Sequence, residues 1–306
     1  MPINSTINTL SAAEKFTSEL DKFFVQKAVT GFLTDNNLRA QFVGAKTVKI
    51  PSLDFVGLVN YDRDNGFSRA KMTVAHEPFT MKMDRGRSIQ VDREDMDEQG
   101  VSNLAGQVLG EYVRTQVVPE CDAYVIQTLA GIINEQNQTV AYTAGKPYET
   151  FNKLVSNVQD AVGYDEELIC FIDPTAYAAF KNSTEISRKI TVSDFKKGSV
   201  DTKVSCIDGI PLLPVSSARM KTLFDFVETD DTKSVGGFSP AEGAKDVHMI
   251  VMPKKAAHLV KKTEKMRIFT PEQNLDADSY KFDYRIYYDL FVKKSNKNAI
   301  WGSFGA

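Results

Sequence analysis

The chain has 306 residues, which is enough for two domains or for one large domain. Hydrophobic residues at 42% and charged residues at 25% are the values of an ordinary folded protein, so a disordered or fibrous chain is excluded. The formal net charge of −3 argues against a protein whose main activity is tight duplex binding, because such proteins rely on a dense basic face.

The sequence contains no signal for a membrane or for secretion. No apolar run approaches the ~20 residues that span a bilayer, and the first residues lack a basic segment followed by an apolar core. The three cysteines, Cys121, Cys170 and Cys206, are widely spaced, odd in number and set in apolar runs. We therefore predict reduced, buried thiols in a protein made in the cytoplasm.

Residues 1–44 are predicted to form an arm. Ser11 is a candidate helix cap, and the following segment carries bulky apolar side chains, among them Phe16, Leu20 and Phe23. Little around this segment is available to bury those side chains. Two arrangements fit the sequence equally well: the arm folds back on its own domain, or it packs on a neighbour.

Residues 45–92 predict a long hairpin. Val48 and Ile50 alternate with polar residues in the first strand, and a second strand runs from about residue 72 to residue 91. The Asn65-Gly66 pair signals a turn in the charged stretch between them. Because an isolated two-stranded ribbon is only marginally stable, either another subunit covers this hairpin or it lies on its own core.

The acidic run at residues 91–100 resembles a calcium-binding loop only in part. Asp95, Asp97 and Gly100 begin an acceptable EF-hand pattern, but the twelfth position is Gly106, where the pattern needs a bidentate glutamate. The simpler interpretation is that these carboxylates precede a helix and offset its dipole.

Residues 101–133 predict one long amphipathic helix. Leu104, Val108 and Tyr112 recur every four residues, and apolar residues resume at helical spacing after Pro119. Such a helix would be roughly 50 Å long. Pro119 cannot donate to the hydrogen-bond ladder and predicts a bend near Val117 or Val118. The alternative is two ordinary helices separated at this point.

Residues 141–258 predict a compact mixed domain of helices and buried strands, close to the usual domain size. The expected elements are a helix capped by Thr150 and stopped by Gly163, a strand at 168–172, a helix started by Asp173, strands at 210–215 and 247–252, and a helix opening at Pro253. The lysines that follow are interpreted as a solvated helix face, although a local basic patch stays open; they are Lys254, Lys255, Lys261, Lys262 and Lys265.

Residues 280–292 predict an unusually long strand. Apolar and aromatic residues occupy every second position from Tyr280 to Val292, which at ~3.3 Å per residue gives a strand of roughly 45 Å. A long helix and an equally long strand can bury each other's apolar faces. We therefore expect an elongated domain built from the helix at 101–133 and this strand, completed by a turn at 295–298 and a last strand at 299–304.

Catalytic motifs are absent from the sequence. It has no phosphate-binding loop, no dinucleotide fingerprint and no nucleophile elbow. His76, His248 and His258 are scattered, and no H-x-x-x-H or C-x-x-C pair starts a zinc site. A Cys–His pair that meets only in space stays open, but Cys170 lies in an apolar ICFI run that is typical of a core. We predict no catalytic residue, no cofactor and no metal.

The order of these elements resembles that of the major capsid proteins of tailed bacteriophages, which share the Hong Kong 97-type shell fold. The local sequence is similar to that of family members from phages of low-GC Gram-positive hosts. The residues that carry the resemblance are GAKTVKIPSLDFVGLVNYDRDNGF (44–67), DRGRSIQVDREDMDE (84–98), VVPECDAY (117–124), RIFTPE (267–272) and KFDYRIYYDLFV (281–292).

The resemblance implies an α+β chain with the HK-97-like capsid fold. Residues 1–44 would be the N-terminal arm and residues 45–92 the extended E-loop lying on a neighbouring subunit. Residues 93–140 and 259–306 would form the peripheral domain with its spine helix, and residues 141–258 the axial domain. The predicted intersubunit contact is the E-loop tip, with Tyr61, Asp62, Arg63, Asp64, Arg69 and Lys71, while Pro119 would bend the spine.

The implied function is self-assembly, through hexamers and pentamers, into an icosahedral head shell in the host bacterial cytoplasm. The shell would enclose double-stranded DNA through weak, non-specific contacts and become part of the virion. A portal protein and a separate scaffolding protein are expected partners. Some family members crosslink a lysine to an asparagine, for which Lys71 with Asn296 or Asn298 are the suggestive positions; no motif places them together, so crosslinking is not expected. The alternatives are an encapsulin-type compartment and a cytoplasmic α/β enzyme.

Overall fold

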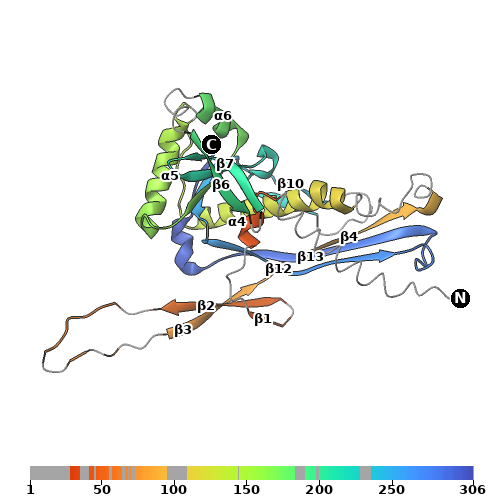
Figure 1. The fold of residues 1–306 in the computed structure, drawn as a ribbon, viewed down its shortest axis with the longest axis horizontal. Coiled ribbons are helices and arrows are strands. Elements are labelled where there is room, and N and C mark those ends of the chain that lie inside the picture. The colour runs from red at the N-terminus through yellow and green to blue at the C-terminus, as the bar shows by residue number, and fades with distance from the viewer. Residues whose placement is uncertain are drawn as a thin grey trace. The chain divides into compact units, whose positions relative to one another are not determined.

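The structure is a computed structural model that describes residues 28–34, 41–44, 46–54, 57–63, 66–67, 69, 73–94, 109–143, 145–182, 190–197, 200–227 and 236–305. The chain divides into two compact units (Figure 1). One unit combines Met1–Asp35 with Asp84–Ala306, and the other is Asn36–Met83. Each unit is described by itself below.

The unit Asn36–Met83 contains the predicted hairpin. Strands β1 (Gln41–Val43), β2 (Thr47–Asp54) and β3 (Thr73–Thr80) form an antiparallel sheet in that order. Residues of β2 and β3 pair without interruption from Thr47 opposite Thr80 to Asp54 opposite Thr73. The side chains of Val48, Ile50 and Met81 are buried. The prediction of a hairpin at this position is confirmed.

The second strand of the hairpin is shorter than predicted. In place of one strand from residue 72 to residue 91, β3 ends at Thr80 and β4 (Met83–Asp92) begins in a different sheet. The alternation of partly buried and exposed side chains continues through the break, so periodicity alone gave no sign of it. The Met81 N–H donates to the carbonyl of Lys46 at 2.8 Å and closes the first sheet.

The long helix is continuous over the described residues. It is helical from Leu109, passes through a π-helical turn at Val113–Val117 and continues as α4 (Val118–Glu135). The alternative of two helices separated at Pro119 is therefore wrong. Residues 101–108 lie outside the described residues, and the bend at Pro119 stays a prediction.

The π-helical turn explains how Pro119 fits inside a helix. In an α-helix its ring would crowd the carbonyl four residues earlier, that of Thr115, and its missing N–H would leave that carbonyl without a donor. The wider turn instead bonds the Val118 N–H to the carbonyl of Val113. Both Val117 and Val118 keep helical backbone angles, so the helix passes the proline without ending.

The strand predicted at residues 280–292 is confirmed as β13 (Ser279–Val292). It pairs antiparallel with β12 (Ala257–Phe269), from Ala257 opposite Val292 to Phe269 opposite Lys281, and the sheet order is β12-β13-β4. A register shift between Lys261 and Thr263 interrupts the ladder once.

The helix predicted to open at Pro253 is wrong. The Ala256 N–H donates to the carbonyl of Pro253 at 2.9 Å in a tight turn, and the next residue begins β12. The short apolar segment there fits either period, and pairing with the long β13 determines the outcome. The lysine cluster therefore lies on a turn and a strand, and the interpretation as a helix face is also wrong.

The long helix packs on β13, as predicted (Figure 1). The rings of Tyr112 and Tyr284 are 6.1 Å apart, and those of Tyr124 and Tyr288 are 5.7 Å apart in edge-to-face geometry. The Tyr124 hydroxyl also donates to Asp289 Oδ1 at 2.8 Å. The helix and the strand thus meet through aromatic rings at two levels, Tyr112 and Tyr124.

A six-stranded sheet forms the second layer of the larger unit, in the order β14-β11-β5-β8-β7-β6. Its strands are β5 (Leu168–Ile172), β6 (Ile190–Lys197), β7 (Val200–Ile207), β8 (Ile210–Pro214), β11 (Val247–Pro253) and β14 (Trp301–Phe304). The predicted strands at 168–172, 210–215 and 247–252 are confirmed. Strands β5 and β8 pair parallel, whereas the other pairs described are antiparallel.

The last strand was expected to complete the domain of the long helix and β13. Instead β14 pairs with β11 at the edge of the six-stranded sheet. The Gly302 N–H donates to the carbonyl of Gln138, and the Val140 N–H donates to the carbonyl of Gly302. Gly302 also lies against Ile133, where an added Cβ would approach Cδ1 to 2.9 Å. The C-terminal strand therefore ties the end of the long helix to the six-stranded sheet.

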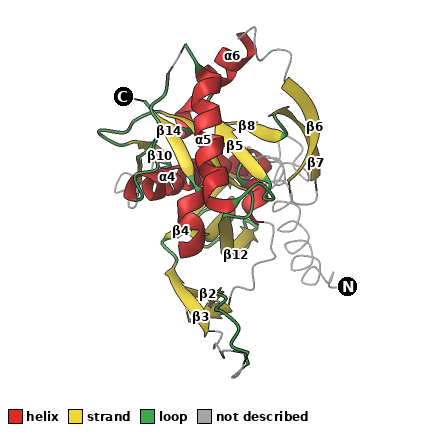
Figure 2. Ribbon diagram, turned by 90° about the vertical axis from the view of Figure 1, so that its left-hand side faces the viewer, coloured by secondary structure: helices red, strands yellow, loops and turns green. Residues whose placement is uncertain are grey.

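Helices α5 (Pro147–Val162) and α6 (Pro174–Asn182) complete this layer, and Figure 2 shows α5 crossing one face of the sheet. The expected stop at Gly163 is confirmed, with φ +83° and an N–H bond to Gln159. The cap at Asp173 is also confirmed, because Oδ1 accepts from the Ala176 N–H at 2.8 Å. Thr150, however, does not cap α5, which begins at Pro147.

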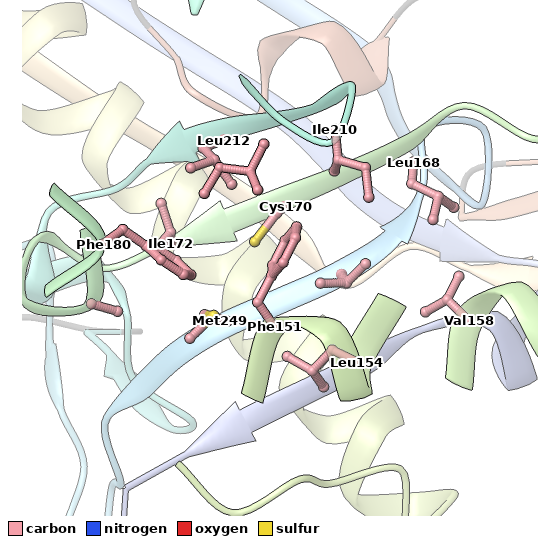
Figure 3. Close-up of a cluster of buried hydrophobic side chains, with 13 residues drawn as sticks. Phe151, Leu154, Val158, Leu168, Cys170, Ile172, Phe180, Ile210, Leu212 and Met249 are labelled. Atoms are coloured by element: carbon pink, nitrogen blue, oxygen red, sulfur yellow. The ribbon is translucent and has the colours of Figure 1, made fainter. Parts of the chain in front are cut away.

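The core of this layer lies between α5, α6 and the sheet (Figure 3). Phe151 points from α5 toward Cys170, and Leu154 and Val158 of the same helix belong to the same buried cluster. Phe151 and Phe180 meet edge to face at 5.9 Å. Two smaller strands, β9 (Phe224–Phe226) and β10 (Phe238–Pro240), pair with each other and contact Tyr124 through Phe226.

Part of the N-terminal arm belongs to this same unit. Gly31–Thr34 form a short 3₁₀ helix in which Phe32 and Leu33 are buried, and Phe32 stacks on Phe171 at 6.1 Å. For these residues the arm folds back on its own chain, while the segment with Phe16, Leu20 and Phe23, for which the two arrangements were weighed, lies outside the described residues. The helix expected after Ser11 lies outside the described residues.

The packing of Phe151 gives a stability prediction. We expect Phe151→Ala to lower the free energy of unfolding by about 3–5 kcal/mol, because the truncation leaves a cavity in a fully buried core. Urea unfolding of the unassembled chain measures this loss. Tyr164→Ala is the control: its side chain is exposed, and its effect should stay within about 0.5 kcal/mol. Equal effects of the two variants would contradict the assignment of this core.

Candidate assembly surface

The connection between β2 and β3 exposes several large apolar side chains. Leu58 is 105% exposed and Phe67 is 86% exposed, and Val59 and Tyr61 are also largely exposed. Among the described residues, five of the nine exposed large hydrophobic side chains belong to the unit Asn36–Met83, which is a small part of the chain. Such a concentration is typical of a surface that a partner covers.

The tip has a defined geometry. The Gly66 N–H donates to the carbonyl of Asp62 at 2.8 Å, and Gly66 has φ +80°, a conformation that favours glycine. This agrees with the turn predicted at Asn65-Gly66, although Asn65 itself lies outside the described residues. The rings of Tyr61 and Phe67 meet at 5.0 Å across the turn. We call the set Leu58, Val59, Tyr61 and Phe67 the apolar tip.

The predicted contact residues lie at this tip where they are described. Tyr61, Asp62, Arg63 and Arg69 are exposed, while Asp64 and Lys71 lie outside the described residues. Sequence reasoning singled out the charged residues and missed Leu58, Val59 and Phe67. The available signal was that three large apolar residues interrupt a polar stretch of the sequence.

The predicted bend residue, Pro119, lies in the first turn of α4, and the residues after it are held by charges. Glu120 and Arg85 form a partly buried ion pair with Nε to Oε1 at 2.6 Å. Burial alone would lower the pKa of Arg85, but the hydrogen bond and the negative charge of Glu120 outweigh it and raise the pKa. Asp122 is fully buried and bonded to Thr30 and Arg219.

The described residues do not form a catalytic arrangement. The three histidines lie on separate strands: His76 on β3, His248 on β11 and His258 on β12. His248 Nδ1 is 3.2 Å from Asp173 Oδ2, and its ring stacks on Tyr142 at 4.0 Å. Since Asp173 also caps α6, we interpret the His248–Asp173 pair as a structural contact. Within the described ranges, no group of three or more His, Cys, Asp or Glu side chains is placed to hold a metal.

A cavity of about 850 Å³ lies between β4, the π-helical turn and β13. Its lining includes Arg85, Glu120 and Tyr288. Arg85 is fully engaged there, since Nη1 donates to the carbonyl of Val227 at 2.5 Å and Nη2 to that of Gly237 at 3.3 Å. Its charge therefore stabilises the fold. Cys121 also lines the cavity, and burial raises the pKa of its thiol.

The suggested crosslink gains no support from the asparagines. The Asn296 side-chain amide donates to the carbonyl of Ala256 at 3.3 Å, and the carbonyl of Asn298 accepts from Trp301 Nε1. Lys71 lies outside the described residues.

No described helix is both long enough and apolar enough to cross a membrane.

Comparison with known proteins gives matches in structure alone. No family model matches the sequence, and no curated protein matches it. The head structure of Helicobacter pylori bacteriophage KHP40 is similar over 91% of this chain and 90% of that chain, with a TM-score of 0.60 at 11% identity. The capsid of cyanophage P-SCSP1u is similar over 87% of this chain and 85% of that chain, with a TM-score of 0.55 at 14% identity.

A third similar structure is the holo-SrpI encapsulin complex from Synechococcus elongatus PCC 7942. It matches over 88% of this chain and 85% of that chain, with a TM-score of 0.52 at 11% identity. All three similarities cover most of both chains. The chain therefore has the fold of shell-forming capsid proteins. Within that class it is an α+β chain with the HK-97-like capsid fold that the sequence resemblance implied.

The cysteines give a chemical test of the described core. Cys121, Cys170 and Cys206 are free and buried, as predicted, and burial raises the pKa of the Cys121 and Cys170 thiols. We expect Cys121 and Cys170 to resist a thiol reagent at about pH 8 in the folded chain and to react once the chain is denatured. Mass spectrometry of labelled peptides measures this. Rapid labelling of Cys170 in the folded chain would contradict its place in the core.

Proposed function

We propose that this chain is the major capsid protein of a tailed phage or prophage. It self-assembles, through hexamers and pentamers, into the icosahedral head shell that encloses packaged double-stranded DNA. The observation that carries the proposal is the fold, which is similar to phage head and capsid structures over about nine-tenths of both chains. The protein is structural, acts in the virion and is assembled in the host bacterial cytoplasm.

The parts of the chain take the roles that the capsid resemblance implies. Residues 1–44 are the arm, 45–92 the E-loop, 93–140 and 259–306 the peripheral domain, and 141–258 the axial domain. One refinement comes from the sheet order, because β14 joins the six-stranded sheet of the axial domain. A portal protein and a separate scaffolding protein complete the head, and the net charge of −3 suits weak, non-specific contact with DNA.

The apolar tip is the contact with a neighbouring copy. Full burial of a large apolar side chain stabilises a complex by about 1.5–3 kcal/mol. Burial of Leu58 and Phe67 against a second copy therefore favours binding at the tip. Arg63 and Arg69 of the same connection are exposed and charged, and interfaces usually combine an apolar centre with a polar rim.

The first experiment tests whether shells form. Electron microscopy and sedimentation of the purified chain should show closed particles. A monomer or dimer under all conditions would overturn the proposal. The similarity to an encapsulin supports a second candidate, a compartment that encloses protein cargo. Nuclease-protected DNA in native particles distinguishes a phage head from that compartment.

The second experiment tests the tip. We expect Phe67→Ser combined with Leu58→Ser to leave the chain folded and to weaken assembly about tenfold or more, because both side chains are already exposed in the single subunit. Circular dichroism measures folding and light scattering measures assembly. Tyr164→Ser is the matched control, an exposed aromatic residue after α5. Normal assembly of the double variant would refute the role of the tip.

A further inference from the structure

The chain enters and leaves the unit Asn36–Met83 through two segments that one turn of α4 holds. Glu120 lies in the first turn of that helix, directly after Pro119, and Asp122 follows two residues later. Glu120 binds Arg85, the second residue after Met83, and Asp122 binds Thr30, which precedes the unit. We call 28–34 the entry root and 84–88 the exit root. Both roots belong to the larger unit.

Asp122 holds the entry root with both carboxylate oxygens. Its Oδ1 accepts from the Thr30 N–H at 3.0 Å and from the Thr30 hydroxyl at 2.6 Å. Its Oδ2 accepts from the Val29 N–H at 3.3 Å and from Arg219 Nη1 at 3.1 Å. The side chain is fully buried. A buried carboxylate is tolerated only when its oxygens are satisfied, so this network fixes residues 29 and 30 tightly.

Glu120 holds the exit root through a two-point contact. Arg85 Nε donates to Oε1 at 2.6 Å, and Nη2 donates to Oε2 at 3.3 Å. Arg85 also donates to the carbonyls of Val227 and Gly237, which connects β4 to the ends of the β9–β10 pair. The adjacent Asp84 pairs with Arg285 of β13 at 2.8 Å. The planar guanidinium group fits this forked geometry, which a lysine could not reproduce.

We propose that Glu120 and Asp122 form a two-point clamp that fixes both roots on one turn of α4, so that the segments before and after the unit Asn36–Met83 are already ordered when a second copy of the chain binds. The role in binding a second copy rests on the proposed shell function. A segment that is ordered before it binds loses less conformational entropy on docking, so assembly is favoured when both roots are held in the free subunit. Loosening either root should therefore slow assembly without removing any contact of the apolar tip.

Hydrogen exchange tests the clamp in the unassembled full-length chain. We expect Glu120→Gln to speed exchange of the exit-root amides about tenfold or more, because the ion pair is replaced by a single hydrogen bond from charged Arg85 to a neutral amide oxygen. Asp122→Asn should do the same at the entry root, since its NH₂ group would face donors. Amides of β5 should not change in either variant. The matched control is Glu111→Gln, an exposed carboxylate earlier in the same helix that pairs with Arg114.

Assembly kinetics of the same variants complete the test. The clamp predicts slower assembly for Glu120→Gln and Asp122→Asn and an unchanged rate for Glu111→Gln. Unchanged exchange at the roots, or faster root exchange with normal assembly, would overturn the proposal. If Asp122→Asn does not fold, Thr30→Val removes only the hydroxyl bond and should still speed exchange at the entry root. If the unaltered chain never assembles, the shell function fails, and the exchange data still decide whether the roots are clamped.

Discussion

The packing of the long helix on β13 is the contact on which the rest of the larger unit depends. Tyr124 contributes to it twice, through its ring against Tyr288 and its hydroxyl on Asp289, and its ring also meets Phe226 of β9. The helix needs this partner because a single helix gains most of its stability from tertiary packing of its apolar face. Once the pair is formed, β12 and β4 extend the sheet on either side of β13, and β14 connects the helix end to the six-stranded sheet.

Sequence periodicity predicted the elements that are long and one-sided. The period of two in β13 and the helical spacing around Tyr112 and Tyr124 each persisted long enough to predict the type of element, although the sequence left open two helices separated at Pro119. Periodicity did not predict the type of element where contacts with distant parts of the chain determine it. The segment after Pro253 satisfies a helix or a strand, and only β13 as a partner makes it a strand. Likewise, no pattern marks residues 81–82 as the point where the chain changes sheets.

The sequence indicated the place of the candidate assembly surface better than it indicated which side chains form it. A long hairpin with an Asn-Gly turn indicated where a contact would lie, but the charged residues drew attention away from Leu58 and Phe67. Apolar residues in a turn are informative only when nothing in the same chain covers them, and that is a property of the fold. The contacts of Glu120 and Asp122 were equally hidden, because their partners lie 35 and 92 residues away in sequence.

The long helix therefore serves two physical purposes. Its apolar side orders the sheet beneath it, and its carboxylates after Pro119 hold the two segments that flank the hairpin unit. The π-helical turn makes these purposes compatible, because it carries the helix past a proline and keeps Tyr112 and Tyr124 on the face that contacts β13. An ordinary break at Pro119 would separate the carboxylates from the first half of the helix. A continuous helix instead connects the packing on β13 to the contacts that hold both roots.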